Sequence, residues 1–179
     1  MLNSVSVSSP AVPVVSREAA LTAARPRLEA LARRLVWDTE EARDVVQGAL
    51  VEAVERWDSL KDPAAREAWL RRIVVNRAFS QLRRRRFWNA LGALLLVPEV
   101  DAAPSPEESA EQKEHQARLA AALERLPARQ SLAFTLRYLE GWSFEEVAAS
   151  MGIDRGTVRV HVQRAVTALR AAGVLGERT

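Results

Sequence analysis

The stretch LPARQSLAFTLRYLEGWSFEEVAASMGIDRGTVRVHVQRAVTALR, residues 126–170, decides the fold of the second half of this 179-residue chain. Its first segment is bounded by residues that favour helix ends. Leu126-Pro127 predicts a helix that begins with proline at its first position, because proline has no N–H to leave unsatisfied there. Gly141 predicts the end of that helix, since glycine adopts the left-handed conformation that a helix cap requires.

Two further helices follow directly in the same stretch. Ser143 with Glu146 three residues later has the spacing of a capping box, which begins a short helix. Gly152 supplies a tight turn, and Asp154 then caps the next helix. The side chains expected to face inward from the short helix are Val147, Ala148 and Met151. Two helices joined in this way predict a helix-turn-helix.

The last predicted helix has two unlike faces. Its apolar stripe, which recurs at helical spacing and should face the core, is Val158, Val162, Ala165, Val166 and Leu169. Its opposite face carries Arg159, Val160, Gln163 and Arg164. Arginine and glutamine can read guanine and adenine edges in a DNA major groove, and we expect Arg155, Arg170 and the helix start to hold phosphates.

The first half of the chain is predicted to contain a long helix that begins after Asp38. A preceding helix carries an apolar stripe of Leu28, Leu31, Ala32, Leu35 and Val36, and the long helix has core positions Ala42, Val46, Ala49, Leu50, Ala53 and Trp57. The remaining face of the long helix carries Asp44, Gln47, Gly48, Val51 and Glu55. A valine and a glycine stand here among polar residues, where a solvated helix usually carries lysine and glutamate, although one exposed valine by itself has no meaning.

The next predicted helix, residues 67–86, is rich in arginine. Its buried side is predicted to be Val74, Val75, Ala78, Phe79 and Leu82. Its other side is predicted to be Trp69, Ile73, Asn76, Arg77, Ser80 and Arg84. An aromatic ring among arginines suits phosphates and unstacked bases. The alternative is a tryptophan half-buried against a neighbouring helix, with arginines that only solvate it.

Composition and charge set the outline of the molecule. The net charge of +3 hides a separation of sign, because residues 65–88 hold eight arginines and one glutamate, and residues 98–114 hold six acids and one lysine. Long helical periodicities and sparse glycine predict an all-α fold of two small helical domains joined by a flexible acidic linker. We place a disordered lead at residues 1–16, the first domain at 17–96, the linker at 97–111 and the second domain at 112–174. The apolar residues 87–97 are too few to span a bilayer, and we expect them to extend a helix packed on the first domain.

Three segments carry a family resemblance. Residues 126–170 resemble region 4 of bacterial sigma-70-family factors, which reads the minus-35 promoter element. EEARDVVQGALVEAVERW, residues 40–57, resembles region 2.2, the helix that docks on the β′ clamp helices of RNA polymerase. AWLRRIVVNRAFSQLRRRR, residues 68–86, resembles regions 2.3 and 2.4, which capture the unwound minus-10 strand. In this order and spacing, the chain is identified as a member of the extracytoplasmic-function group, group IV.

The resemblance implies three sets of contact residues. Core polymerase would be bound by Asp44, Gln47, Val51 and Glu55. The minus-10 strand would be bound by Lys61, Trp69, Ile73, Asn76, Arg77 and Arg84, with the loop of residues 58–66 around a flipped base. The minus-35 element would be bound by Arg155, Thr157, Arg159, Val160, Gln163 and Arg164. The chain departs from the usual family residues at Leu50, where the departure concerns packing, and at Ser80. It also departs at Val160 and His161, so we expect its preferred minus-35 element to differ.

The implied partners are core RNA polymerase, at its β′ clamp helices and β flap, promoter DNA and an anti-sigma factor in the cytoplasm. We expect no enzymatic activity, no small-molecule substrate and no cofactor, because the chain has no cysteine, no phosphate-binding glycine loop and no nucleophile motif. His115 and His161 have no partner at metal-ligand spacing. The alternative is a stand-alone helix-turn-helix transcription regulator of the response-regulator output type, which would bind duplex DNA without polymerase.

Overall fold

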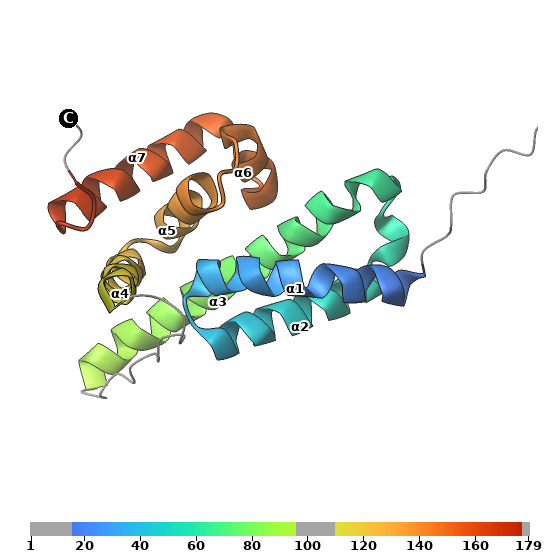
Figure 1. The fold of residues 1–179 in the computed structure, drawn as a ribbon, viewed down its shortest axis with the longest axis horizontal. Helices are drawn as coiled ribbons and strands as arrows, with labels where there is room; N and C mark the ends of the chain where they lie inside the picture. Colours follow the sequence, from blue (N-terminus) through green and yellow to red (C-terminus); the bar gives the residue numbers. More distant parts are fainter. Residues whose placement is uncertain (1–15, 96–109, 177–179) are drawn as a thin grey trace, which may run out of the picture.

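The computed structural model describes residues 16–95 and 110–176, and within these ranges every regular element is helical. The described residues form seven α-helices. These helices lie in two groups (Figure 1). The first bundle contains α1 (Arg17–Val36), α2 (Thr39–Glu55) and α3 (Arg66–Leu95). The second bundle contains α4 (Ala110–Arg125), α5 (Ala128–Phe134), α6 (Phe144–Met151) and α7 (Arg155–Ala171). The predicted all-α fold is confirmed for the described residues.

The first two helices are joined by a tight turn. Trp37 ends α1 in the left-handed conformation, at φ 59°, and its N–H bonds to the carbonyl of Arg33. Asp38 then caps α2 by accepting a hydrogen bond of 2.7 Å from the backbone N–H of Glu41. The predicted start of the long helix after Asp38 is therefore confirmed, and the turn sends α2 back along α1.

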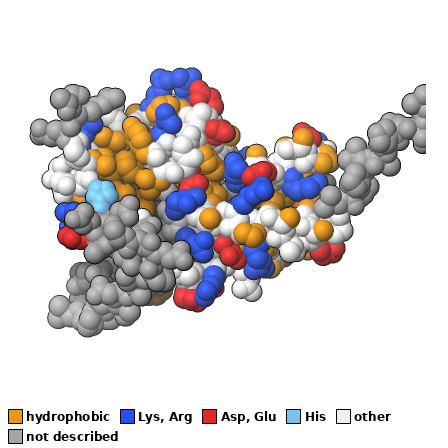
Figure 2. All heavy atoms as spheres, viewed as in Figure 1, with side chains coloured by type: hydrophobic (Ala, Val, Ile, Leu, Met, Phe, Trp, Pro, Cys, Tyr) orange, Lys and Arg blue, Asp and Glu red, His pale blue; other side chains and the backbone are white. Residues whose placement is uncertain are grey.

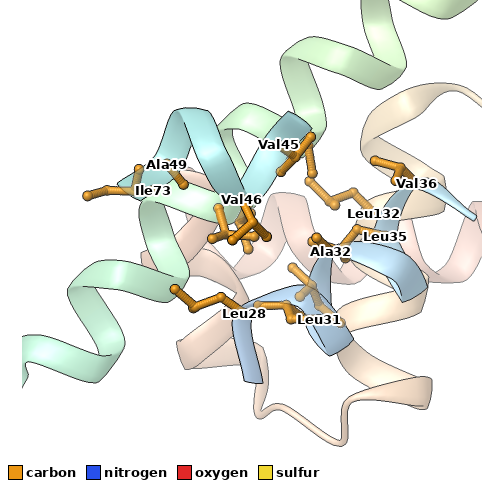
Figure 3. Packing of buried hydrophobic residues seen from close by; sticks show 14 of the residues in the cluster. Leu28, Leu31, Ala32, Leu35, Val36, Val45, Val46, Ala49, Ile73 and Leu132 are labelled. Carbon is orange, nitrogen blue, oxygen red and sulfur yellow. The ribbon is translucent and has the colours of Figure 1, made fainter. Parts of the chain in front are cut away.

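The core of the first bundle lies where its three helices meet (Figure 3). The predicted stripe of α1 is buried throughout, and most of the predicted stripe of α2 is buried with it. The helix α2 ends at Glu55, so Trp57, which was predicted as its last core position, lies instead in the following 3-10 turn, Trp57–Ser59, and is only half-buried. Figure 3 also places Leu132, from α5 of the second bundle, beside the residues of α1 and α2. One hydrophobic cluster therefore runs through both bundles, and a second cluster lies between α4, α5 and α7 of the second bundle.

The caps predicted for the second bundle are confirmed. Ser143 and Glu146 form both hydrogen bonds of the capping box, at 3.1 Å and 2.8 Å. Gly152 ends α6 in the left-handed conformation, at φ +64°, and Asp154 accepts a 2.8 Å bond from the N–H of Thr157. The inward stripe of α7 is buried except for Val166, which is half-buried.

The segment before α6 differs from the single helix that the sequence predicts. Pro127 is the N-cap of α5 and not its first residue. Beyond Phe134 the backbone widens into a π-helical turn, Thr135–Leu139, in which the N–H of Glu140 bonds to the carbonyl of Thr135 at 3.0 Å. Such a turn inserts an extra residue into a helix and shifts the side chains that follow it. Gly141 still ends the segment at φ +73°, as predicted.

The two bundles are also joined by polar contacts. Arg85 of α3 donates to the carbonyl of Val36 and to Glu41, both at 3.0 Å, and forms a 3.0 Å ion pair with Glu124 of α4. Arg86 donates to the carbonyls of Leu123 and Glu124 at 3.3 Å. Half of the arginine run at residues 83–86 therefore holds helices together, which the sequence did not indicate.

The apolar run after the arginines continues α3 as far as Leu95, so a helix extension is confirmed. Phe87 and Trp88 do not pack on the first bundle as expected, because they are 63% and 57% exposed and contact each other edge to face. Residues 1–15 of the predicted lead, 1–16, and residues 97–109 of the predicted linker, 97–111, lie outside the described residues. Ser16 is not part of a disordered lead, because it caps α1, and residues 110–111 already belong to α4. Within the described residues, no helix is long and apolar enough to cross a membrane.

Candidate nucleic-acid interface

The face of α2 opposite its buried stripe is open to solvent. Asp44, Gln47, Val51 and Glu55 are all exposed, and Val51 has 53% of its surface accessible. Val54 beside this face is also exposed. Figure 2 shows acidic and basic side chains interspersed with apolar ones over the part of the surface that carries α1 and α2. An apolar centre with polar neighbours has the composition of a protein-docking surface.

The side chain of Arg77 occupies the space above Gly48, at the edge of this face. A Cβ atom at Gly48 would lie 2.3 Å from Nη1 of Arg77. The Arg77 Nε donates to Glu52 of α2 at 3.1 Å, and Glu52 also pairs with Arg56 at 2.8 Å. The sequence analysis grouped Arg77 with the strand-binding residues of α3. The structure instead lays its side chain across α2, beside the docking face.

The exposed face of α3 is narrower than predicted. Asn76 and Arg84 are exposed, and Trp69 is half-buried. The placement of Ile73 on this face is wrong, because Ile73 is only 4% exposed and packs beside Ala49 of α2 (Figure 3). The helix α3 is covered on more than one side, so an apolar residue next to the predicted stripe also enters the core. Ile73 therefore cannot reach a ligand without rearrangement.

The loop before α3 is held in shape by two tryptophans. Trp57 and Trp69 meet edge to face with ring centroids 6.3 Å apart, and the guanidinium of Arg66 lies 5.5 Å from the Trp57 ring. Between them, Asp62 caps the short turn Pro63–Ala65 by accepting from the N–H of Ala64 at 2.8 Å. Lys61 is exposed on the same loop. The loop thus presents a cation beside an aromatic ring, a combination suited to a nucleotide.

The outward face of α7 is as the sequence predicts. Arg159, Val160, Gln163 and Arg164 are all exposed. Val160, Gln163 and Arg164 line a depression together with Thr167, whereas Arg159 lies outside it. Because the stripe opposite is buried, this face can enter a groove while the helix remains packed.

The residues at the start of α7 are already engaged within the protein. Arg155 forms an ion pair with Glu145 at 2.7 Å. Thr157 is half-buried, and both its N–H and its hydroxyl bond to Asp154. These hydrogen bonds lower the pKa of Asp154, the bond from the hydroxyl more than the bond from the backbone. Thr157 therefore serves the helix cap first, and Arg155 must exchange Glu145 for any phosphate it binds.

Phe144 is a residue of this surface that the sequence analysis missed. The guanidinium of Arg159 lies 5.4 Å from the centre of its ring, and that of Arg137 lies 5.1 Å from it. Arg137 is itself held by a 3.1 Å bond to the carbonyl of Trp142. Cation–π contacts of this kind restrict a flexible arginine. No periodicity in the sequence relates Phe144 to Arg159, since they lie on different helices.

Burial changes the acid–base properties of two groups near the bundle junction. Burial lowers the pKa of Arg86 to about 10, with a further contribution from neighbouring Arg85, so Arg86 stays charged at neutral pH. Burial also lowers the pKa of His161, and the cations of Arg129 and Arg164 act in the same direction. Both ring nitrogens of His161 are buried without a hydrogen-bond partner among the described atoms. Within the described residues, no three His, Asp or Glu side chains are grouped as metal ligands.

Both bundles are similar to known proteins. The family model for sigma-70 region 2 matches residues 21–87, and the model for sigma-70 region 4 matches residues 116–169. The RNA polymerase sigma-E factor of Streptomyces avermitilis is 36% identical over 149 residues, which cover 82% of this chain and 80% of that protein. The ECF RNA polymerase sigma factor SigL of Mycobacterium tuberculosis is 33% identical over 144 residues, 78% of each chain.

Two solved structures are similar along most of the chain. The sigma factor RpoE of Bartonella quintana, in complex with the anti-sigma factor NepR, has a TM-score of 0.66 and 28% identity, covering 89% of this chain and 98% of that one. CnrH in complex with the cytosolic domain of CnrY has a TM-score of 0.58 and 25% identity, covering 87% and 85%. The likeness extends over both bundles and not over the helix-turn-helix alone.

Proposed function

Since this chain belongs to the sigma-70 family, as an RNA polymerase sigma factor of the extracytoplasmic-function group, we propose which of its surfaces carries each step of transcription initiation. The observation that carries the assignment is that its two bundles expose chemically different faces. The α2 face has an apolar centre, and the α7 face is basic and contains an amide. A stand-alone helix-turn-helix regulator is not favoured, because region 2 is matched as well as region 4.

Core RNA polymerase binds the α2 face in this proposal. Val51 provides the apolar centre, and Asp44, Gln47 and Glu55 surround it. Arg77, which lies above Gly48, extends this face and contributes a cation at its edge. The face therefore suits a polymerase surface that offers both apolar and charged groups.

Promoter DNA binds two other faces. The unwound minus-10 strand binds Lys61, Trp69, Asn76 and Arg84 of the loop and α3, where stacking on an aromatic ring contributes roughly 1–3 kcal/mol per base. Ile73 supports this face from inside the core, because it is buried. The minus-35 element binds α7, where Arg159, Gln163 and Arg164 meet base edges and Val160 suits a thymine methyl group.

The protein itself catalyses no reaction in this proposal, and bond formation belongs to the polymerase. We place the protein in the cytoplasm with core polymerase and promoter DNA as partners. An anti-sigma factor is a further proposed partner, because the similar sigma factor RpoE of Bartonella quintana was solved in complex with the anti-sigma factor NepR.

Reconstitution with core polymerase tests the proposed function. The protein with core enzyme should select and transcribe promoters from a DNA library that core enzyme alone does not transcribe. Asp44→Lys with Gln47→Ala should weaken core binding about tenfold or more, while helicity by circular dichroism stays unchanged. Glu18→Lys on α1 is the matched charge reversal and should bind normally. Full affinity of the double variant would remove the α2 face from the interface.

A further inference from the structure

A cavity of ≈490 Å³ lies between the first bundle and α6 of the second bundle. Its first wall is the loop between α2 and α3 together with the first turns of α3, and its second wall is the turn before α6 and α6 itself. The helices α3 and α6 contact each other beside it (Figure 1). Pockets that bind small molecules generally have volumes of about 300–1,000 Å³, so this cavity has the size of a ligand site.

The apolar part of the lining consists of two aromatic rings and small side chains. Trp69 of α3 and Trp142 of the turn both line the cavity, and each is half-buried. Trp69 is held by its edge-to-face contact with Trp57, and the guanidinium of Arg71 lies 5.7 Å from the ring of Trp142. The rest of the apolar lining is Leu60, Ala65, Ala68 and Ala149. Two held rings among small side chains suit a flat aromatic group.

Two cations at the cavity have no acidic partner. Lys61 of the loop and Arg72 of α3 line it and are exposed, and neither forms an ion pair with any described residue. A third cation, Arg71, pairs with Glu67, which does not line this cavity. An ammonium group and a guanidinium group in one wall attract a carboxylate, sulfonate or phosphate, and such charge-assisted hydrogen bonds are stronger than neutral ones.

The two acids of the lining do not cancel this attraction, because both are caps. Asp62 accepts a 2.8 Å hydrogen bond from the backbone N–H of Ala64. Glu146 accepts a 2.8 Å hydrogen bond from the backbone N–H of Ser143 at the start of α6. The partial positive charge of the N–H groups at these helix ends offsets the charge of each carboxylate. The cavity therefore favours an anion over a cation.

We propose that this cavity binds a small aromatic anion, with its planar ring against Trp69 and Trp142 and its acidic group at Lys61 and Arg72. Offset and edge-to-face contacts with the two tryptophans both stabilise such a ring. The two walls belong to different bundles, so the ligand contacts both of them at once. A ligand that binds only the folded protein raises its unfolding temperature. A free aromatic acid and a nucleotide share this chemistry, and the test distinguishes them.

The probe is the fluorescent aromatic anion 1-anilinonaphthalene-8-sulfonate, added to the full-length protein. Titration should show one bound dye per chain, with enhanced emission and a raised unfolding temperature. Indole-3-acetate should displace the dye, and tryptamine, which has the same ring but carries a cation, should not. Adenosine monophosphate represents the nucleotide source, and the anion that displaces the dye at the lower concentration identifies the source. Equal displacement by indole-3-acetate and tryptamine would overturn the selection for an anion.

Two variants change the cavity in different ways. Ala149→Trp adds a large side chain at an exposed position of α6 that lines the cavity, and it should abolish dye binding. Arg72→Glu reverses one of the unpaired cations and should weaken binding about tenfold or more. The matched reversal Arg84→Glu lies on the same helix outside the cavity and should bind the dye normally. Trp88→Ala is a second control, because the exposed Phe87–Trp88 pair is another apolar surface that can bind a dye.

Normal dye binding by Ala149→Trp, in a protein of unchanged helicity by circular dichroism, would overturn the site. If Ala149→Trp loses helicity, unchanged binding by Arg72→Glu is the result that overturns it. Loss of binding in Trp88→Ala would place the dye at the end of α3 and would also overturn it. These measurements contain neither DNA nor polymerase, so they do not depend on the roles proposed for Lys61 and Trp69 in strand binding. Transcription with core polymerase tests those roles separately.

Discussion

The two bundles differ in how their structure is encoded. The second bundle contains two short helices, α5 and α6, and its α6 and α7 begin at caps made by residues three positions apart, Ser143 with Glu146 and Asp154 with Thr157. The first bundle is built from long helices whose side chains find partners far along the chain, such as Arg77 with Glu52. Local patterns therefore predict where α6 and α7 of the second bundle begin, and they leave the surfaces of the first bundle undecided.

The largest expected effect is on the free energy of unfolding, and it tests whether the two bundles are stabilised together or separately. Leu82 is almost fully buried on α3, and Leu82→Ala should lower the free energy of unfolding by about 2–5 kcal/mol. Because one core runs through both bundles, amide exchange should accelerate in α5 and α6 as well as in α1–α3. Leu82→Met, which conserves volume, is the control. Acceleration confined to α1–α3 would mean that the bundles are energetically separate.

The next largest effect is expected on the recognition of DNA bases by α7 of the second bundle. Arg159→Ala should relax base preference at particular minus-35 positions, at a cost of roughly 1–3 kcal/mol. Phe144→Leu should act on the same positions to a smaller extent, because it leaves Arg159 without the ring that restrains it. Selection from a promoter library with each holoenzyme measures the preference. Arg170→Ala should instead weaken binding to all promoter sequences alike and reduce the dependence of that binding on salt concentration. If Arg159→Ala selects the same minus-35 bases as the parent protein, α7 does not read that element.

A smaller effect is expected where Arg77 crosses α2. Gly48→Ala should gain about 1 kcal/mol of helix propensity but displace the Arg77 guanidinium from Glu52, so the free energy of unfolding should change little. In an Arg77→Ala background there is nothing to displace, and the same substitution should stabilise by about 1 kcal/mol. The cycle is measured by urea unfolding. Equal effects in the two backgrounds would show that Arg77 does not occupy the space above Gly48 in solution.

The smallest expected effect is on acid stability of the second bundle. Hydrogen bonds from Thr157 hold the pKa of Asp154 below its ordinary value of 3.8. A depressed pKa means that the contribution is present above the ordinary value and is lost as the pH falls through the lowered one. Asp154→Asn keeps a capping side chain without a charge, so it should flatten the pH dependence of thermal unfolding below about pH 4 while leaving neutral stability almost unchanged. Identical acid profiles would remove Asp154 from this role.

The sequence by itself determined the elements and their caps. Asp38, the capping box at Ser143, and the left-handed Gly141 and Gly152 all act through contacts within a few residues, so their effect can be recognised without knowing the fold. The buried stripes of α1 and α7 were determined in the same way, because a helical period fixes which side chains share a face. The outward residues Arg159, Gln163 and Arg164 follow from that period as well.

Only the tertiary structure decided which arginines are available and which apolar residues are core. Arg77 and Arg85 bond to partners 25 and 44 residues away, whereas Arg84 in the same helix stays exposed. Ile73 is buried because α3 is enclosed on more than one side. The meeting of Trp142 with Arg71 depends on how two bundles pack. These outcomes are set by contacts between distant segments, and no local period or cap in a sequence specifies such contacts.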